Sequence, residues 1–363
     1  MQAVMNYATS RISHNKPCVG REELEALRQV FARHWLIKGE EAEKLEHTVA
    51  RLVGVKYALA VNSGLSALHL ALLSLGVTKG DQVILPTYTC VALLHAVNYV
   101  GAVPILVDSS KEGFNMDPVL VAKMCSKRTK AIIVPHTFGF PAAIDRILQL
   151  RVPVIEDCAQ GLGSTYLGKP LGSFGDISVF SFYATKVVAT GQGGMLATNN
   201  KRYFQTACDL VHPGIGATYR ARYNYLMPDV AAAIGNSQLP KLRSFISRRK
   251  AIAASYRAVL QKKSSLSFVP GKKDTHVNHF RFIIRFRNEG ARDTARKVLL
   301  KKGIASIPPI SRDELLHRLL KLPDHSFPYA ERLAETALSL PIYPCLRDTE
   351  VGRIVRALHS LPL

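Results

Sequence analysis

Acidic residues and clustered cysteines are both scarce in this sequence. The chain has 363 residues, with 27 Asp and Glu against 48 Lys and Arg, and its formal net charge is +21. Six cysteines are scattered without a CxxC pair or the spacing of a zinc finger. This pattern argues against a disulfide framework and a structural zinc site, and it suits a reducing cytoplasm.

Long apolar runs are also missing. The stretch AVNSGLSALHLALLSLGV carries His69, and a strand end followed by a helix explains it better than a membrane span does. The first residues, MQAVMNYATSRISHNK, lack the apolar core of a signal peptide. We therefore expect a cytoplasmic protein with no membrane insertion.

The excess of positive charge suggests nucleic acid, an anionic membrane surface or a phosphorylated substrate as partner. The charges are spread along the chain and concentrate only loosely in the last third. A generally basic surface without a specific partner is the simplest explanation, and we expect no nucleic-acid partner. Arg281, Arg285 and Lys301 are candidates for attracting an anionic substrate, on sequence proximity alone.

Helices alternate with short, nearly all-apolar strands up to about residue 200, which predicts an α/β chain with a mainly parallel sheet covered on both faces. A long helical stretch broken at Pro240 follows. After it we expect an alternating strand in HFRFIIRFRN, a helix over ARDTARKVLLKKG, a helix over PYAERLAETALSL and a closing helix. We predict a large domain over 1–245, with an N-terminal arm of about 20 residues, and a smaller α+β domain over 246–363.

Polar or small residues follow four of the predicted strands. They stand in the segments NSG, PTYTC, EDCAQ and SFYATK. Ligands of open α/β sheets bind outside the carboxyl ends of the strands, so these four ends are expected to meet at one pocket.

The segment VPVIEDCAQ places Glu156 and Asp157 after four apolar residues. A carboxylate there would be buried and would need a cation or several hydrogen-bond donors. One of the two either caps the next helix or pairs with an arginine, or it holds a cationic ring nitrogen of a cofactor.

Lys186 lies among small and apolar residues, with the glycine cluster GQGG just behind it. Alone it would be an ordinary surface lysine, but the glycines let the backbone approach a ligand closely. A lysine held out of water has a lowered pKa and forms Schiff bases. Together with a carboxylate for a pyridinium nitrogen, it makes the pair that enzymes using pyridoxal 5'-phosphate (PLP) require.

A phosphate site would complete this constellation. The segment NSGLSAL offers free N–H groups at the start of a helix, although Ser63 could simply cap that helix. Ser181 offers a hydroxyl near Lys186, or it is only a turn residue.

Four ordered segments resemble the DegT/StrS family of PLP-dependent sugar aminotransferases. In chain order, these segments contain the sequences VNSGLSALHLALLSLG, VIEDCAQGLGSTYLGKPLGSFGD, SFYATKVVATGQGGMLATNN and ARYNYLMPDVAAAIGNSQLPKL. The resemblance covers residues 16–242 well and the last third loosely. It implies the type I PLP fold of aspartate aminotransferase, as a homodimer with active sites at the subunit interface.

The resemblance also implies roles around the cofactor ring. Lys186 matches the Schiff-base lysine, Asp157 the partner of the pyridine nitrogen and Gln160 the residue near the ring hydroxyl. Cys90 stands where the family often has an aromatic ring over PLP, so its thiol would contact the ring face unless Tyr88 turns in. By itself, Cys90 is expected to be a small buried hydrophobic residue.

A second set of implied roles concerns the phosphate. Ser181 and the amides around Gly64, Leu65 and Ser66 match the phosphate cradle, and Asn224 matches an asparagine that reaches the neighbouring subunit's cofactor. Many relatives have Thr at the position of Leu65, and Ser66 is the candidate to replace that hydroxyl. His136 matches a common family position, and we expect it to be structural.

The family resemblance implies transfer of an amino group from glutamate or glutamine to a keto-sugar, commonly nucleotide-linked. The product would serve polysaccharide, lipopolysaccharide or secondary-metabolite synthesis. Two alternatives stay open. Sugar dehydratases on this fold replace the lysine by histidine or add clustered cysteines, neither of which is found here. A basic binding protein without catalysis would not need the site residues.

Overall fold

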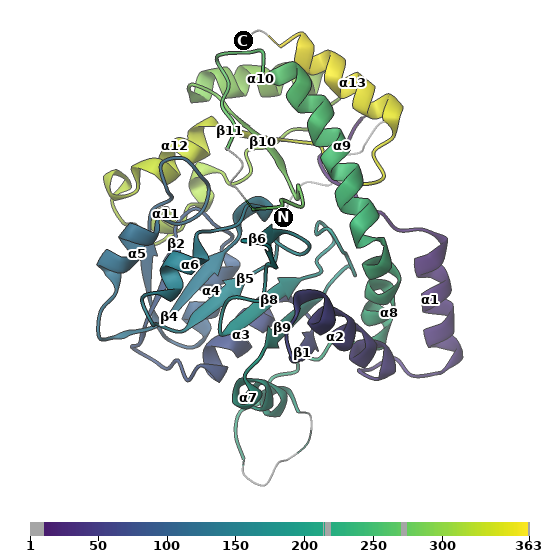
Figure 1. The fold of residues 1–363 in the computed structure, drawn as a ribbon, viewed down its shortest axis with the longest axis vertical. Coiled ribbons are helices and arrows are strands. Elements are labelled where there is room, and N and C mark those ends of the chain that lie inside the picture. Colours follow the sequence, from purple (N-terminus) through teal and green to yellow (C-terminus); the bar gives the residue numbers. More distant parts are fainter. Residues whose placement is uncertain (1–10, 213, 215–218, 270–273, 362–363) are drawn as a thin grey trace.

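The core of the protein is a seven-stranded sheet in the order β1-β9-β8-β5-β4-β2-β3. The computed structural model describes residues 11–212, 214, 219–269 and 274–361 (Figure 1). The strands are β1 Tyr57–Val61, β2 Gln82–Pro86, β3 Val103–Val107, β4 Thr129–Pro135, β5 Val154–Asp157, β8 Ile177–Ser181 and β9 Gly194–Thr198. Only β9 runs antiparallel to its neighbours, so the predicted mainly parallel α/β sheet is confirmed.

Alternate residues of each strand enter different cores, which is why the strands are nearly all apolar. Leu59 and Val61 pack in one core, whereas Ala58 and Ala60 pack in the other. Helices α3 (Gly64–Ser74), α4 (Ala92–Tyr99) and α7 (Lys201–Val211) cover the first face. Helices α2 (Glu40–Val53), α5 (Pro118–Met124), α6 (Ile144–Leu148) and α8 (Asp229–Gln238) contribute to the second.

Several shorter elements connect this framework. Helix α1 spans Arg21–Ala32, and β6 (Thr165–Tyr166) pairs with β7 (Lys169–Pro170) in a small hairpin. The 3₁₀ turns are η1 Thr137–Gly139, η2 Leu239–Lys241, η3 Arg312–Glu314 and η4 Asp324–Ser326. The break predicted at Pro240 is confirmed, because η2 separates α8 from the long helix α9 (Leu242–Leu260).

The C-terminal part packs around a third core that includes α9. Its strands β10 (Phe282–Arg285) and β11 (Ala337–Leu340) pair antiparallel. Helices α10 (Glu289–Lys301) and α13 (Asp348–His359) also pack in this third core, whereas α11 (Leu316–Leu319) and α12 (Pro328–Thr336) pack in the first. The expectation of one helix over PYAERLAETALSL was therefore wrong at its end, because residues 337–340 form ladder hydrogen bonds with a distant strand instead.

The N-terminal segment reaches this third core. Ile12 forms a bridge with Ile304 and packs beside Tyr256 and Leu338, both far from it in sequence. Residues 1–10 of the predicted arm lie outside the described residues. The domain boundary near residue 245 stays a prediction. Among the described helices, none combines the length and hydropathy needed to cross a membrane.

Candidate active site

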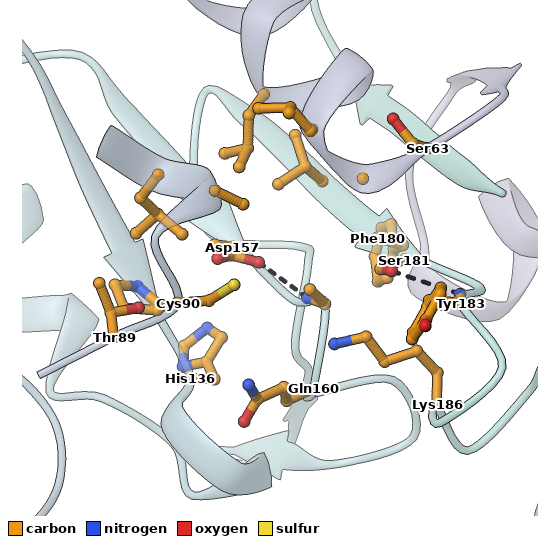
Figure 2. Close-up of a pocket in the computed structure, with 18 of the residues that line it drawn as sticks. Ser63, Thr89, Cys90, His136, Asp157, Gln160, Phe180, Ser181, Tyr183 and Lys186 are labelled. Carbon is orange, nitrogen blue, oxygen red and sulfur yellow. Dashed lines mark hydrogen bonds between the residues drawn. The ribbon is translucent and has the colours of Figure 1, made fainter. Parts of the chain in front are cut away.

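The carboxyl ends of β1, β2, β5 and β8 meet at one cavity of about 280 Å³. Its lining includes Ser63 after β1, Cys90 after β2, Asp157 at the end of β5, Ser181 at the end of β8, and Lys186 (Figure 2). The predicted convergence of strand ends is thus seen in the fold. Gly64, Leu65, Gln160 and His136 line the same cavity.

Asp157 is the carboxylate of β5 that faces the cavity. Its Oδ1 accepts a hydrogen bond from the backbone N–H of Ala159 at 2.9 Å, and the side chain points into the open space (Figure 2). Burial raises the pKa of Asp157, an effect that the Ala159 hydrogen bond and the charge of Lys186 oppose. In the described part of the chain, no cation lies within ion-pair distance of Asp157.

Glu156 faces the opposite side of the sheet, where its carboxylate is fully engaged. It accepts hydrogen bonds from His136 Nε2 at 2.9 Å and from the backbone N–H groups of Gly172, Phe174 and Gly175 at 2.5, 2.9 and 3.0 Å. A Cβ on Gly175 would lie 2.9 Å from the carbonyl oxygen of Val154, so only glycine brings this amide so close. The open question about the two carboxylates is answered: Glu156 is structural.

His136 is held on both sides of its ring. Its Nδ1 accepts from the N–H of Ala142 at 3.0 Å, which leaves Nε2 to donate to Glu156. This agrees with the expectation of a structural histidine. Its ring nevertheless forms part of the cavity wall.

Lys186 sits on a loop that is tied down at several points. Its N–H donates to the carbonyl of Tyr183 at 2.8 Å, and Asn15 Nδ2 donates to the carbonyl of Thr185 at 2.9 Å. Nζ lies 5.3 Å from the centroid of the Phe280 ring. Burial lowers the pKa of Lys186, although the negative charge of Asp157 opposes this. Lys186 is therefore not a surface charge, and a buried lysine with a lowered pKa can serve as a nucleophile or base.

Gln160 presents its amide group to the cavity in a fixed orientation. Its Oε1 accepts from the N–H of Phe138 at 2.6 Å, so the NH₂ group is turned toward the open space between His136 and Lys186 (Figure 2). A hydrogen-bond donor is therefore aimed at any ligand that lies against Asp157.

The start of α3 forms one end of the cavity. Ser63 caps the helix by accepting from the N–H of Ser66 at 3.0 Å, whereas in the described part of the chain the amides of Gly64 and Leu65 have no acceptor. The Ser66 hydroxyl donates to Asn62 at 2.6 Å, and Ser66 does not line the cavity. Ser181 lies beside Gly64, where a Cβ would come within 3.0 Å of Ser181 Cβ.

Cys90, not Tyr88, borders the cavity. Tyr88 is fully buried against Phe114 and Phe138, where its ring cannot reach the site. The expectation that Cys90 is a buried hydrophobic residue was wrong, because Cys90 is exposed and its sulfur points into the cavity (Figure 2). It lies in the connection between β2 and α4, beyond the carboxyl end of the strand, rather than in the interior of the sheet.

Asn224 lies away from this cavity and is exposed. Its backbone carbonyl accepts from Asn62 Nδ2 at 3.1 Å. The sequence analysis did not identify two residues that contact the Lys186 loop, Asn15 and Phe280. Both are far from Lys186 in the sequence. No local pattern could have found them, because only folding brings them there.

Comparisons with known proteins agree with this arrangement. The chain is 34% identical over 361 residues to the GDP-perosamine synthase of Escherichia coli O157:H7, covering 95% of this chain and 97% of that one. Its structure resembles the aminotransferase TlmJ of Streptoalloteichus hindustanus, with a TM-score of 0.90, 30% identity and coverage of 96% and 98%. A Streptococcus pneumoniae protein assigned as a sugar aminotransferase, solved in its PLP form, gives 0.90 at 25% identity and covers 97% and 98%. Since residues 17–359 match the family throughout, the chain belongs to the DegT/DnrJ/EryC1/StrS aminotransferase family and is a PLP-dependent enzyme of the type I fold.

Proposed function

We propose that the cavity around Lys186 is the PLP site and that this chain aminates a nucleotide-linked keto-sugar there. That the protein is a PLP-dependent aminotransferase acting on a keto-sugar follows from its family. The assignment of roles to individual residues and the choice of the sugar carrier are the proposal. The observation that carries it is the position of Asp157: its buried carboxylate has no ion-pair partner among the described residues and lines the same cavity as Lys186.

The residues present fit the cofactor. The carboxylate of Asp157 lacks a cation, and a protonated ring nitrogen would supply one. At the other end, the free amides of Gly64 and Leu65 and the hydroxyl of Ser181 fit a phosphate at a helix N-terminus. Ser66 is already used by Asn62, so its predicted contribution to the cradle would need that bond to break.

Each residue that lines the cavity has a separate chemical role in this proposal. PLP, when bound, supplies an electron sink for the bond that breaks at the substrate carbon. Lys186 would hold the cofactor through Nζ, and its amine would be the base and acid that moves a proton at the substrate carbon. Asp157 keeps the ring nitrogen protonated, because a buried carboxylate strongly favours a nearby cation. The NH₂ group of Gln160 would donate to the ring hydroxyl, and Cys90 would contact the cofactor in place of an aromatic side chain.

The substrates are an amino donor and a sugar. The relative that makes GDP-perosamine supports a nucleotide-linked sugar, and we infer glutamate or glutamine as the donor. We further propose a cytoplasmic homodimer in which Asn224, exposed on its own subunit, reaches the neighbouring active site. The two-domain division near residue 245 belongs to the same proposal.

The test is an absorbance spectrum of the purified protein with added PLP, beside that of Lys186→Ala. We expect a band near the visible edge that glutamate shifts to shorter wavelength and that the variant lacks. Amino transfer by Lys186→Ala should fall by at least about a thousandfold, since the lysine provides both the covalent link and the proton transfer. A variant that keeps the band would show that another residue holds the cofactor, and no band in the wild type would overturn the proposal.

A further inference from the structure

Arg281 brings a second cation close to the reaction site. It directly precedes β10, and its guanidinium lies between two aromatic rings, 5.9 Å from the centroid of Phe138 and 5.5 Å from that of Phe280. Both rings belong to residues that also contact the active site: Phe138 through Gln160 and Phe280 through Lys186.

Among the described residues, Arg281 has no counter-charge at ion-pair distance; the carboxylate of Glu314 acts on it only from farther away. Its Nη1 lies 3.3 Å from His14 Nε2, and its buried Nε has no acceptor. Within the described ranges, no carboxylate lies within ion-pair distance of it. His14 cannot compensate, because burial and the charge of Arg281 lower the pKa of His14 to about 3 and keep it neutral.

A buried arginine elsewhere in the chain shows what a purely structural role looks like. Arg249 donates to the backbone carbonyls of His279, Phe280 and Ile342, the last at 2.7 Å. These bonds tie α9 to the third core. In the part of the chain that the structure describes, Arg281 has His14 as a partner of Nη1 and no acceptor for Nε, so the fold leaves part of its hydrogen-bonding capacity unused.

The cationic groups of Arg281 and Lys186 both lie near the aromatic ring of Phe280. Lys186 Nζ is 5.3 Å from the Phe280 centroid and Arg281 Cζ is 5.5 Å from it, so the two cations are no farther apart than these distances combined. The carboxylates of glutamate lie roughly 3–5 Å from its amino nitrogen. A charge-assisted hydrogen bond adds about 3 Å, so a donor at Lys186 spans roughly 6–8 Å. Reaching Arg281 requires the two cations to lie closer together than the limit set by the shared ring, and the charge of Arg281 does act on Lys186.

We propose that Arg281 binds a carboxylate of the amino donor. The inference rests on the proposed function, and it adds a specificity-determining residue to that site. A guanidinium matches a carboxylate with two parallel hydrogen bonds, which fixes the orientation of the donor as well as its position. The apolar rings on both sides strengthen this pairing, since they keep water away from it.

A competing occupant is the anionic part of the sugar substrate. Arg281 does not line the cavity around Lys186; it borders a neighbouring cavity of about 280 Å³, together with Lys250, Arg257 and His279. A diphosphate there would meet several cationic side chains. The donor is favoured because Lys186, where the amino group must react, lies on the same ring as Arg281.

The experiment titrates the PLP-loaded enzyme with glutamate, following the absorbance shift of the first half-reaction, which involves no sugar. The variants are Arg281→Gln, Arg281→Lys and, as matched control, Arg285→Gln. Arg285 is the last residue of β10 and also has a buried Nε without an acceptor, but the cavity that it lines does not include Lys186. Calorimetry with glutarate, a dicarboxylate without an amino group, measures binding independently of turnover.

We expect Arg281→Gln to raise the half-saturating glutamate concentration at least tenfold and to weaken glutarate in parallel, with partial recovery in Arg281→Lys and no change in Arg285→Gln. Titration with glutamine then identifies the carboxylate: weakening of both donors indicates the α-carboxylate, and weakening of glutamate alone indicates the side chain. Unchanged glutamate binding overturns the inference, as does a variant that only raises the KM of the sugar. Loss of the PLP band in the wild type would instead refute the proposed function.

Discussion

Two neighbouring residues of β5 face regions of opposite character. Glu156 points into a compact structural region made by His136 and the loop from Gly172 to Gly175, where four hydrogen bonds meet its carboxylate. Asp157 points into the cavity, where a single backbone amide meets it. Both carboxylates are buried, so the difference lies in the partners and not in access to solvent.

The comparison shows how a structural charge differs from a binding charge. A buried ion without partners costs several kcal/mol, so a fold normally supplies them. The fold does so for Glu156, whose pKa is lowered overall although burial alone would raise it. It does not do so for Asp157, whose pKa is raised by burial. A buried carboxylate left in this state is a candidate for binding a cationic ligand, as we propose for Asp157.

Of the three substitutions compared, Asp157→Asn, on the cavity side of β5, should have the largest effect on activity. We expect amino transfer to fall roughly a thousandfold, because the amide cannot hold a protonated ring nitrogen. Unfolding of the cofactor-free protein in urea should change by less than about 1 kcal/mol, since Asn keeps the acceptor for Ala159. A variant that loses stability and activity together would remove the distinction between the two carboxylates.

Glu156→Gln should have the opposite pattern to Asp157→Asn, with its main effect on stability. We expect the free energy of unfolding to fall by about 3 kcal/mol, because an amide NH₂ would then face backbone N–H donors. The loss should be pH-dependent: the lowered pKa of Glu156 stabilises the fold above its unfolded pKa, and this contribution disappears as pH falls through the folded value. Urea denaturation at neutral and acidic pH measures both. An equal difference at both pH values would mean that the charge is not responsible.

Gly64→Ala should give the smallest effect. The new Cβ would lie 3.0 Å from Ser181 Cβ, so the cradle must open slightly. We expect PLP affinity to fall about tenfold, equivalent to about 1.4 kcal/mol. Gly290→Ala is the control, because its Cβ meets nothing closer than 3.7 Å and α10 lies in the third core region. Equal PLP affinity in Gly64→Ala and wild type would place the phosphate elsewhere.

Local sequence patterns predicted much of the scaffold and part of the site. Apolar strands alternating with helices gave the parallel sheet, and the polar strand ends identified the cavity edge. The error at residues 337–340 has a clear cause: this segment continues a helical pattern, but pairing with β10 prevails over local preference. Cys90 was misjudged for a related reason, since its exposure depends on where the sheet edge opens.

The sequence by itself determined the chemistry available to this protein. Lys186, Asp157, Ser181 and the segment NSGLSAL are written in local order, and strand ends of a parallel sheet must share one edge. Only the tertiary structure decided which carboxylate faces the cavity, that Gln160 turns its NH₂ group inward, and that Arg281 lies near Lys186. These outcomes depend on strand register and on contacts between residues far apart in the chain. Periodicity within a short segment carries no information about such contacts.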